Sequence, residues 1–346
     1  MLRSAVLTLA FLLLAAAPAG AAPGILGAGT DPGVAVDSAG TAHVGWLGGN
    51  TLEYCQVPRG TRKCSVRQTF PLSAPGIADV QVLAPRTGAV FLVASVLSDP
   101  AVLLSSADGG ATFASRPIGS LGLISQAVFG PGETVALLSD GASFARYGTD
   151  GAGPPDWAVS FADATEALST SLASFGGGYA AFFGGASQSR SALWNGLGDP
   201  NLPQSWVEGP RLGSERLAPS AMGGPRGTYV AYTDRRRGSA MRVRRLRSTG
   251  RLGPARRVSG DDPTAIHAAQ GPRGDMIVLW RKFPDEVRFV RSRKGSRWTR
   301  PRRLFRGHEP QALRPALGAR GGWMVWAGGG SDSVVRIAAL PRAPRR

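Results

Sequence analysis

The chain has 346 residues, of which 48 are Gly and 26 are Pro, so about one position in five disfavours the interior of a helix. Hydrophobic residues make up 43% of the chain and include eight Trp and 13 Phe, which excludes a wholly disordered protein. Only 18% of residues are charged, yet 40 Lys and Arg against 23 Asp and Glu leave a net charge of +17. This composition excludes a protein of long helices and favours one large, basic all-β domain.

Residues 1–22 have the three parts of a secretory signal peptide. Arg3 supplies the positive charge, Ala5 to Ala17 the apolar stretch, and Ala19 to Ala21 the small-residue cleavage pattern. A retained membrane anchor is the alternative, but the apolar run is shorter than the roughly 20 residues of a membrane span. No later run is long enough to cross a bilayer. We expect a secreted mature chain in which residues 23–346 form a single domain.

The two cysteines, Cys55 and Cys64, enclose a short loop that contains Pro58 and Gly60. Two nearby thiols in an oxidising compartment are expected to form a disulfide, which would hold a local hairpin. A zinc site is the alternative, but it needs a cluster of ligands. The histidines are instead scattered through the chain, at His43, His267 and His308. We expect neither a metal site nor a cofactor.

One pattern recurs along the whole chain. It consists of an apolar run, a turn with Gly, and a second apolar run that ends at a hydrophobic residue, as in Val34 to Trp46. The copies follow one another at intervals of about 44–49 residues, which indicates a repeat architecture. The seven copies end at Trp46, Ala94, Leu138, Phe183, Tyr232, Trp280 and Trp326.

Each interval also holds a second apolar pair around another turn, such as Met241 to Leu246 followed by Pro254 to Val258. Four short antiparallel strands in a unit of about 46 residues are typical of a β-propeller blade, and the mature chain has room for seven. The last unit has only three strands, so we expect Gly24 to Gly29 to add the fourth and close the ring. The alternatives are six blades with an irregular segment, and then a solenoid or a sandwich.

The segment SSADGGATF resembles the Asp-box of bacterial neuraminidase repeats, the BNR repeats of the sialidase-like superfamily of propellers. The matching residues are Ser106, Asp108, Gly110, Thr112 and Phe113. The resemblance implies a structural turn between the third and fourth strands of a blade. The segment Ser292 to Trp298 is a degenerate copy that lacks the Asp.

Active sialidases, to which this chain is similar in its repeats, bind the substrate carboxylate with three arginines and attack with a Tyr activated by Glu. The first arginine lies in a Phe/Tyr-Arg-Ile-Pro motif near the N-terminus, and this chain lacks that motif. The first predicted blade has no Arg before Arg59, which lies beside the predicted disulfide. We therefore expect no sialidase catalysis and assign no catalytic residue. Tyr179, Tyr229 and Tyr232 lie in predicted strands and are expected in the core.

In a four-stranded blade, the loops between the second and third strands and between blades lie on the face opposite the Asp-box turn. Charged residues gather in these loops. They are Asp99, Asp140, Arg190, the run from Asp234 to Arg237, Asp261, Asp262, His267, Arg281, Lys282, Asp285, Glu286, the run from Arg306 to Glu309, and Asp332. The sequence predicts an anion-binding surface within this set, formed by Arg190, Asp234, Arg235, Arg236, Arg237 and Arg281. A solvated loop surface without a ligand is the alternative.

Charge divides unevenly between the two parts of the chain. Residues 1–208 have a net charge of −5 and residues 209–346 a net charge of +22, which places the basic surface on predicted blades five to seven. Such a field attracts polyanions, and no module that reads nucleic-acid sequence is present. We therefore predict a secreted binding or interaction module for acidic glycans, cell-wall polymers or other extracellular polyanions. The alternatives are a divergent exo-acting glycoside hydrolase of sialidase type and a purely structural envelope protein.

Overall fold

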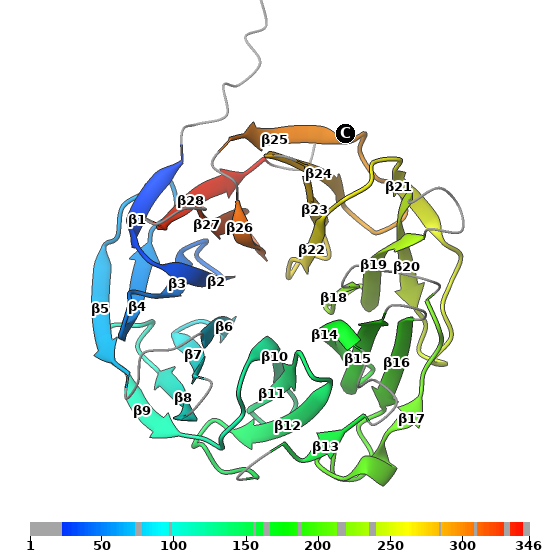
Figure 1. Cartoon of the computed structure of the whole chain (residues 1–346), viewed down its shortest axis with the longest axis horizontal. Helices are drawn as coiled ribbons and strands as arrows, with labels where there is room; N and C mark the ends of the chain where they lie inside the picture. The colour runs from blue at the N-terminus through cyan, green and yellow to red at the C-terminus, as the bar shows by residue number, and fades with distance from the viewer. Residues whose placement is uncertain are drawn as a thin grey trace, which may run out of the picture.

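The structure is a computed structural model, and Figure 1 shows its strands arranged as a ring of radial blades. The residues that it describes are 23–72, 78–96, 99–154, 157–161, 167–185, 189–212, 219–234, 240–283, 285–307, 310–328 and 333–341. These residues form seven antiparallel sheets of four strands each, which confirms the predicted seven-bladed β-propeller. The predicted signal peptide, residues 1–22, lies outside the described residues.

Blades one to four follow one another along the chain, each with its strands in sequence order from the axis outward. Blade one consists of β2 (Thr30–Val36), β3 (Ala42–Leu47), β4 (Thr51–Val57) and β5 (Val66–Pro71). Blade two consists of β6 (Ala78–Arg86), β7 (Ala89–Val96), β8 (Asp99–Ser106) and β9 (Ala114–Pro117). Blade three consists of β10 (Ile124–Gly130), β11 (Thr134–Ser139), β12 (Ser143–Gly148) and β13 (Val159–Ser160). Blade four consists of β14 (Ala167–Phe175), β15 (Gly178–Gly185), β16 (Ser189–Trp194) and β17 (Val207–Glu208).

Blades five to seven complete the ring. Blade five consists of β18 (Ser220–Met222), β19 (Thr228–Asp234), β20 (Ala240–Leu246) and β21 (Arg256–Ser259). Blade six consists of β22 (Ala265–Gln270), β23 (Met276–Lys282), β24 (Glu286–Ser292) and β25 (Arg302–Arg306). Blade seven consists of β26 (Gln311–Gly318), β27 (Gly321–Ala327) and β28 (Val334–Leu340), with β1 (Gly24–Ala28) as its outer strand.

The N-terminal strand closes the ring as the sequence predicted. β1 pairs antiparallel with β28, with Gly24 opposite Ile337 and Ala28 opposite Val334. Figure 1 shows the two strands side by side at the junction of the last and first blades. Because β28 is covered in this way, it does not present a free sheet edge to solvent.

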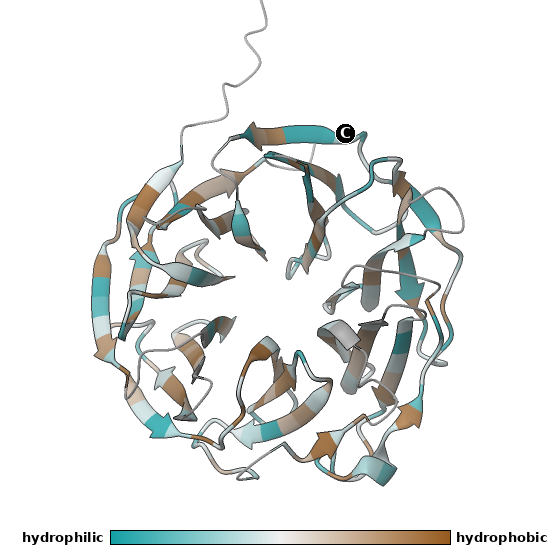
Figure 2. Cartoon of the chain, viewed as in Figure 1, coloured by the Kyte–Doolittle hydropathy of each residue, from teal (hydrophilic) through white to brown (hydrophobic). Residues whose placement is uncertain are grey.

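The core is divided among the interfaces between neighbouring blades. Seven clusters of buried hydrophobic side chains are present, one for each interface, and the cluster between blades seven and one contains Leu26, Trp46 and Trp323. The residues that end the seven sequence repeats all lie in second strands and are buried. Figure 2 shows hydrophobic stretches along many of the strands and hydrophilic stretches that include most of the outer strands β21 and β25. The sequence repeat therefore arises from the buried residues that pack each blade against its neighbours.

The two faces of the disc differ in the connections that they carry. We call the side with the turns between first and second and between third and fourth strands the turn face. The side with the connections between second and third strands and between blades is the loop face. Every inner strand runs from the loop face to the turn face, so the N-terminal half of each inner strand lies nearer the loop face.

The segment that resembles an Asp-box connects β8 to β9 on the turn face. Asp108 Oδ1 accepts hydrogen bonds from the amides of Ala111 and Thr112, and Asp108 Oδ2 accepts one from Thr112 Oγ1 at 2.6 Å. The hydrogen bonds from Thr112, with that from Ser106, hold the pKa of Asp108 well below its usual range. Phe113 packs edge to face on Tyr54 of blade one, so this aromatic side chain lies between two blades.

The predicted disulfide is present. Cys55 in β4 is bonded to Cys64 in the following turn of blade one, with their Cα atoms 5.4 Å apart. The bond therefore joins the third strand to its own hairpin loop. None of the helices among the described residues is long and apolar enough to span a membrane.

Candidate functional site

All seven inner strands contribute residues to a cavity on the axis of the propeller. Its volume is about 300 Å³, at the lower end of the range of small-ligand sites. The lining residues come mainly from the N-terminal halves of the inner strands, and Asp140 comes from the loop between β11 and β12. The cavity therefore lies toward the loop face, and we call it the channel mouth.

Polar side chains dominate the lining of the channel mouth. They are Asp79, Gln81, Ser125, Gln126, Asp140, Ser169, Thr170, Ser171, Ser220, His267 and Arg314. Alternating side chains of a strand point to opposite sides, so each inner strand can direct polar residues to the axis and apolar residues to its neighbours. The described residues that line the channel mouth include no aromatic side chain other than His267.

Several of these polar groups connect neighbouring blades. Gln126 Oε1 accepts a hydrogen bond from Ser171 Oγ at 2.8 Å and one from Leu172 N at 3.0 Å, which joins blades three and four. Ser171 Oγ in turn accepts one from the amide of Ala221, and Ser220 Oγ accepts one from the amide of Ala268. These hydrogen bonds fix the inner strands around the axis, so the channel mouth is preorganised.

Four ionisable groups meet in the channel mouth from four different blades: Asp79, Asp140, His267 and Arg314. Arg314 Nη1 lies 3.5 Å from His267 Nδ1. Burial raises the pKa of Asp79 to about 6, the charge of Arg314 opposes this shift, and the charge of Asp140 adds to it. Burial also raises the pKa of Asp140, again against the attraction of Arg314. The positive charge of Arg314 is thus held close to two carboxyl groups.

Histidine 267 is neutral in this setting. Burial lowers the pKa of His267 to about 3, and the positive charges of Arg314 and Arg281 act in the same direction. At physiological pH the imidazole can therefore donate one hydrogen bond and accept another without adding charge. With Asp79 and Asp140 ionised, the channel mouth combines acceptors, a neutral imidazole and one guanidinium.

The structure does not bring the described residues of the predicted anion surface together in the channel mouth. Arg281 is near the channel mouth, where Nε lies 3.0 Å from Thr264 Oγ1 and Nη1 donates to the carbonyl of Pro310 at 3.3 Å. Asp234 is paired with Arg242, with Oδ2 and Nε 3.2 Å apart, and does not line the cavity. Arg190 is half-buried in β16. Arg235, Arg236 and Arg237 lie outside the described residues, so this part of the surface stays a prediction.

Sequence reasoning placed Asp140 and His267 on this face but missed Asp79 and Arg314. Both lie in inner strands whose other residues are mostly apolar, at Ala78–Arg86 and Gln311–Gly318. A charged residue near the start of an otherwise apolar first strand was the available signal. Nothing in the sequence showed that the two residues meet, because they lie on blades two and seven.

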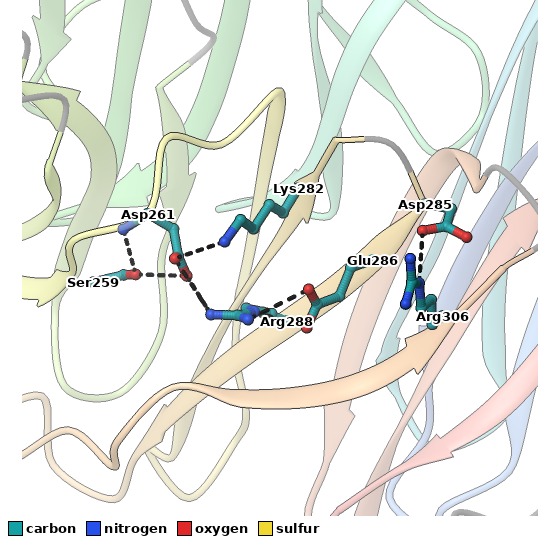
Figure 3. A network of polar contacts seen from close by, with 7 residues as sticks. All are labelled: Ser259, Asp261, Lys282, Asp285, Glu286, Arg288 and Arg306. Carbon is teal, nitrogen blue, oxygen red and sulfur yellow. Dashed lines mark hydrogen bonds and ion pairs between the residues drawn. The ribbon is translucent and has the colours of Figure 1, made fainter.

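Three bases of blade six on the loop face are paired with acids (Figure 3). Arg288 lies between two carboxylates and binds both, while a lysine and a second arginine each have one acidic partner. The pairs are Arg288 with Asp261 (3.1 Å) and Glu286 (2.8 Å), Lys282 with Asp261 (3.5 Å), and Arg306 with Asp285 (3.3 Å). The positive charge of these three bases is therefore balanced by two acids of blade six and one in the link that precedes it.

Comparisons with known proteins agree on the fold. The BP39L lectin from Burkholderia pseudomallei has a TM-score of 0.63 and 14% identity over 91% of this chain and 96% of that chain. A structure of YCF48 bound to D1 peptide has a TM-score of 0.53 and 14% identity over 92% and 93%. A protein of unknown function from Dyadobacter fermentans has a TM-score of 0.53 and 9% identity over 93% and 99%. The shared feature is the β-propeller fold.

Neither the protein-family models nor the curated proteins contain a match to the chain. At these levels of identity the solved structures establish the architecture, and function has to be argued from the side chains. The described residues that line the channel mouth include one arginine, Arg314, and no tyrosine. They also contain no group of three or more His, Cys, Asp or Glu placed to hold a metal ion.

Proposed function

We propose that this chain is a secreted glycan-binding propeller that takes one sugar unit of an acidic glycan into the channel mouth. The observation that carries the proposal is the meeting of Arg314 with Asp79, Asp140 and neutral His267 in a polar cavity. The expected signal peptide and the disulfide between Cys55 and Cys64 support export.

The chemistry of the four groups suits an acidic sugar. A guanidinium binds a planar carboxylate through two parallel hydrogen bonds, which is the role of Arg314. Carboxylates accept hydrogen bonds from neighbouring hydroxyl groups, which is the role of Asp79 and Asp140. Burial of these groups away from bulk water favours ligands that satisfy all of them together. The hydrogen bonds among the inner strands hold the lining in place before the ligand arrives.

The test is titration calorimetry with a uronic-acid-containing oligosaccharide and with a neutral oligosaccharide of equal length. We expect Arg314→Gln to weaken binding of the acidic sugar at least tenfold, whereas Arg302→Gln, an exposed substitution on outer strand β25, leaves it unchanged. Acidic-sugar binding should strengthen between pH 7 and pH 5, because protonation of Asp79 removes a negative charge near the ligand. Equal affinity of the Arg314→Gln protein and the unmodified protein would contradict the proposal.

A divergent glycoside hydrolase is the second candidate, and one observation favours it. Asp79 and Asp140 lie in one cavity and have raised pKa values, as expected of an acid and base pair that acts on a glycosidic bond. The test is the release of a fluorophore from sialosides and from other exo-glycosides. Turnover that disappears in both Asp79→Asn and Asp140→Asn would establish the hydrolase, and absence of turnover in the unmodified protein would reject it.

A further inference from the structure

A second concave surface lies on the turn face, opposite the channel mouth. We call it the basic basin. Its exposed basic residues come from the turns of blades one, five, six and seven, and the groove between them has a volume of about 590 Å³. They are Arg59, Arg226, Arg273, Arg293, Lys294 and Arg320. Within the described part of the chain, none of these six side chains forms an ion pair.

The acidic residue that lines the basic basin already has a buried basic partner. Asp275 lines the groove, and its Oδ2 accepts a hydrogen bond from Arg291 Nη2 at 2.8 Å. Arg291 is 3% exposed and also donates to the carbonyl oxygen of Pro341. Asp275 therefore balances a buried guanidinium and leaves the six exposed bases without compensation.

Three of these side chains pack against tight turns. Arg226 packs over the turn at Gly274, where a Cβ would lie 2.3 Å from Arg226 Cγ. Arg59 and Arg320 flank the turn at Gly40, since a Cβ placed there would lie 3.4 Å from each of them. The bases are thus gathered by turns of different blades and not by one flexible loop.

The basic surface extends further over blade five. A second groove of about 500 Å³ shares Lys294 with the basin and is lined by Arg245, Arg247 and Arg256, and its described lining includes no acid. Arg245 stacks on the ring of Tyr229, and Arg256 donates to the carbonyl of Ser296. The two grooves, joined at Lys294, together form a track of positive charge across four blades.

In blade six, three bases have acidic partners on the loop face, whereas the exposed bases of the basic basin have none among the described residues. In blade six, Arg288, Lys282 and Arg306 have acidic partners, as Figure 3 shows, whereas Arg273 and Arg293 of the same blade have none among the described residues. Neighbouring unpaired charges of one sign repel one another and lower the stability of the fold. A bound polyanion would remove that repulsion.

We propose that the basic basin binds a linear acidic polysaccharide that bears repeated sulfate or carboxylate groups. Arginine forks suit such planar or tetrahedral oxyanions, and a groove that crosses several blades suits a chain with repeated charges. This site lies on the other face from the channel mouth and does not depend on the function proposed there.

Two other polyanionic partners fit less well. Single-stranded nucleic acid usually stacks its bases on exposed aromatic rings, but the aromatic residue in the two grooves, Tyr229, is 6% exposed. A membrane surface usually takes up exposed apolar side chains as well as charge. Among the described residues, the large exposed hydrophobic ones line neither groove; they are Ile25, Leu197, Leu202, Val207 and Phe283.

The experiment compares two variants with the same loss of charge. The basin variant carries Arg226→Gln, Arg273→Gln, Arg293→Gln and Arg320→Gln. The control variant carries Arg116→Gln, Arg257→Gln, Arg302→Gln and Arg303→Gln, all at exposed positions outside the two grooves. The probes are dextran sulfate and polygalacturonate, with neutral dextran, duplex DNA and phosphatidylserine vesicles as comparisons. Thermal melting verifies that both variants are folded.

We expect the basin variant to bind dextran sulfate or polygalacturonate at least tenfold more weakly than the unmodified protein, with a shallower dependence on salt. The control variant should stay within about twofold, and the basin variant should retain binding of the oligosaccharide in the channel mouth. Equal losses of affinity in both variants would show that net charge alone accounts for the binding, which would overturn the proposal. Preference of the unmodified protein for DNA or vesicles over both polysaccharides would overturn it as well.

Discussion

Replacement of Asp79 by Asn should stabilise the protein at neutral pH. The fold raises the pKa of Asp79 from 3.8 to about 6, mainly because burial penalises the ionised carboxylate. One pKa unit corresponds to about 1.4 kcal/mol, so a shift of this size costs at most about 3 kcal/mol once Asp79 is fully ionised. Partial solvent access of Asp79 reduces the expected gain from Asp79→Asn to about 1–2 kcal/mol.

The sign of the pH dependence follows from the direction of the shift. Because the folded state holds the Asp79 proton more tightly than the unfolded state does, the unmodified protein loses stability as pH rises from about 4 through 6. The advantage of Asp79→Asn should therefore be full above pH 7 and should vanish near pH 4. His267 shifts in the other direction, but it is present in both proteins and cancels from the difference.

The assay is urea unfolding followed by tryptophan fluorescence at pH 4, 5, 6, 7 and 8. Asp108→Asn is the matched comparison, because hydrogen bonds lower the pKa of Asp108 and the same substitution should destabilise the protein at neutral pH. If Asp79→Asn is destabilising at pH 7, the attraction between Asp79 and Arg314 outweighs burial; if its effect does not change with pH, the two cancel. Either result would show that the reasoning is wrong.

Three further predictions test the architecture. Gly110→Ala should lower the free energy of unfolding, measured in urea titrations, by over about 1 kcal/mol more than Gly109→Ala does. Both residues have positive φ, but only at Gly110 would a Cβ meet Tyr54 Oη, at 1.9 Å. Cys55→Ala with Cys64→Ala should cost about 2–3 kcal/mol, and a reducing agent should then have no further effect on the thermal midpoint. Deletion of Gly24–Ala28 should expose the edge of β28 and remove Leu26 from the core. Light scattering should then report aggregation at a lower temperature, whereas an unchanged aggregation temperature would show that closure by β1 contributes little.

The sequence by itself determined the blade number, the four strands of each blade, the closing strand and the disulfide. These features depend on local patterns: a blade is a run of short strands and turns, and its apolar positions repeat at the interval of one blade. Cys55 and Cys64 are joined within one hairpin, so their pairing needed no knowledge of distant parts of the chain.

The tertiary structure alone decided which charged groups meet. Asp79 and Arg314 line one cavity although they lie on blades two and seven, because closure of the ring brings all inner strands to a common axis. The net charge of +22 in residues 209–346 was visible in the sequence, but its balance on each face was not. Acids of blade six and of the link before it neutralise Lys282, Arg288 and Arg306 on the loop face. On the turn face, turns from four blades bring together bases that have no acidic partner among the described residues. Electrostatic interactions depend on distance in space, and only the folded ring sets those distances.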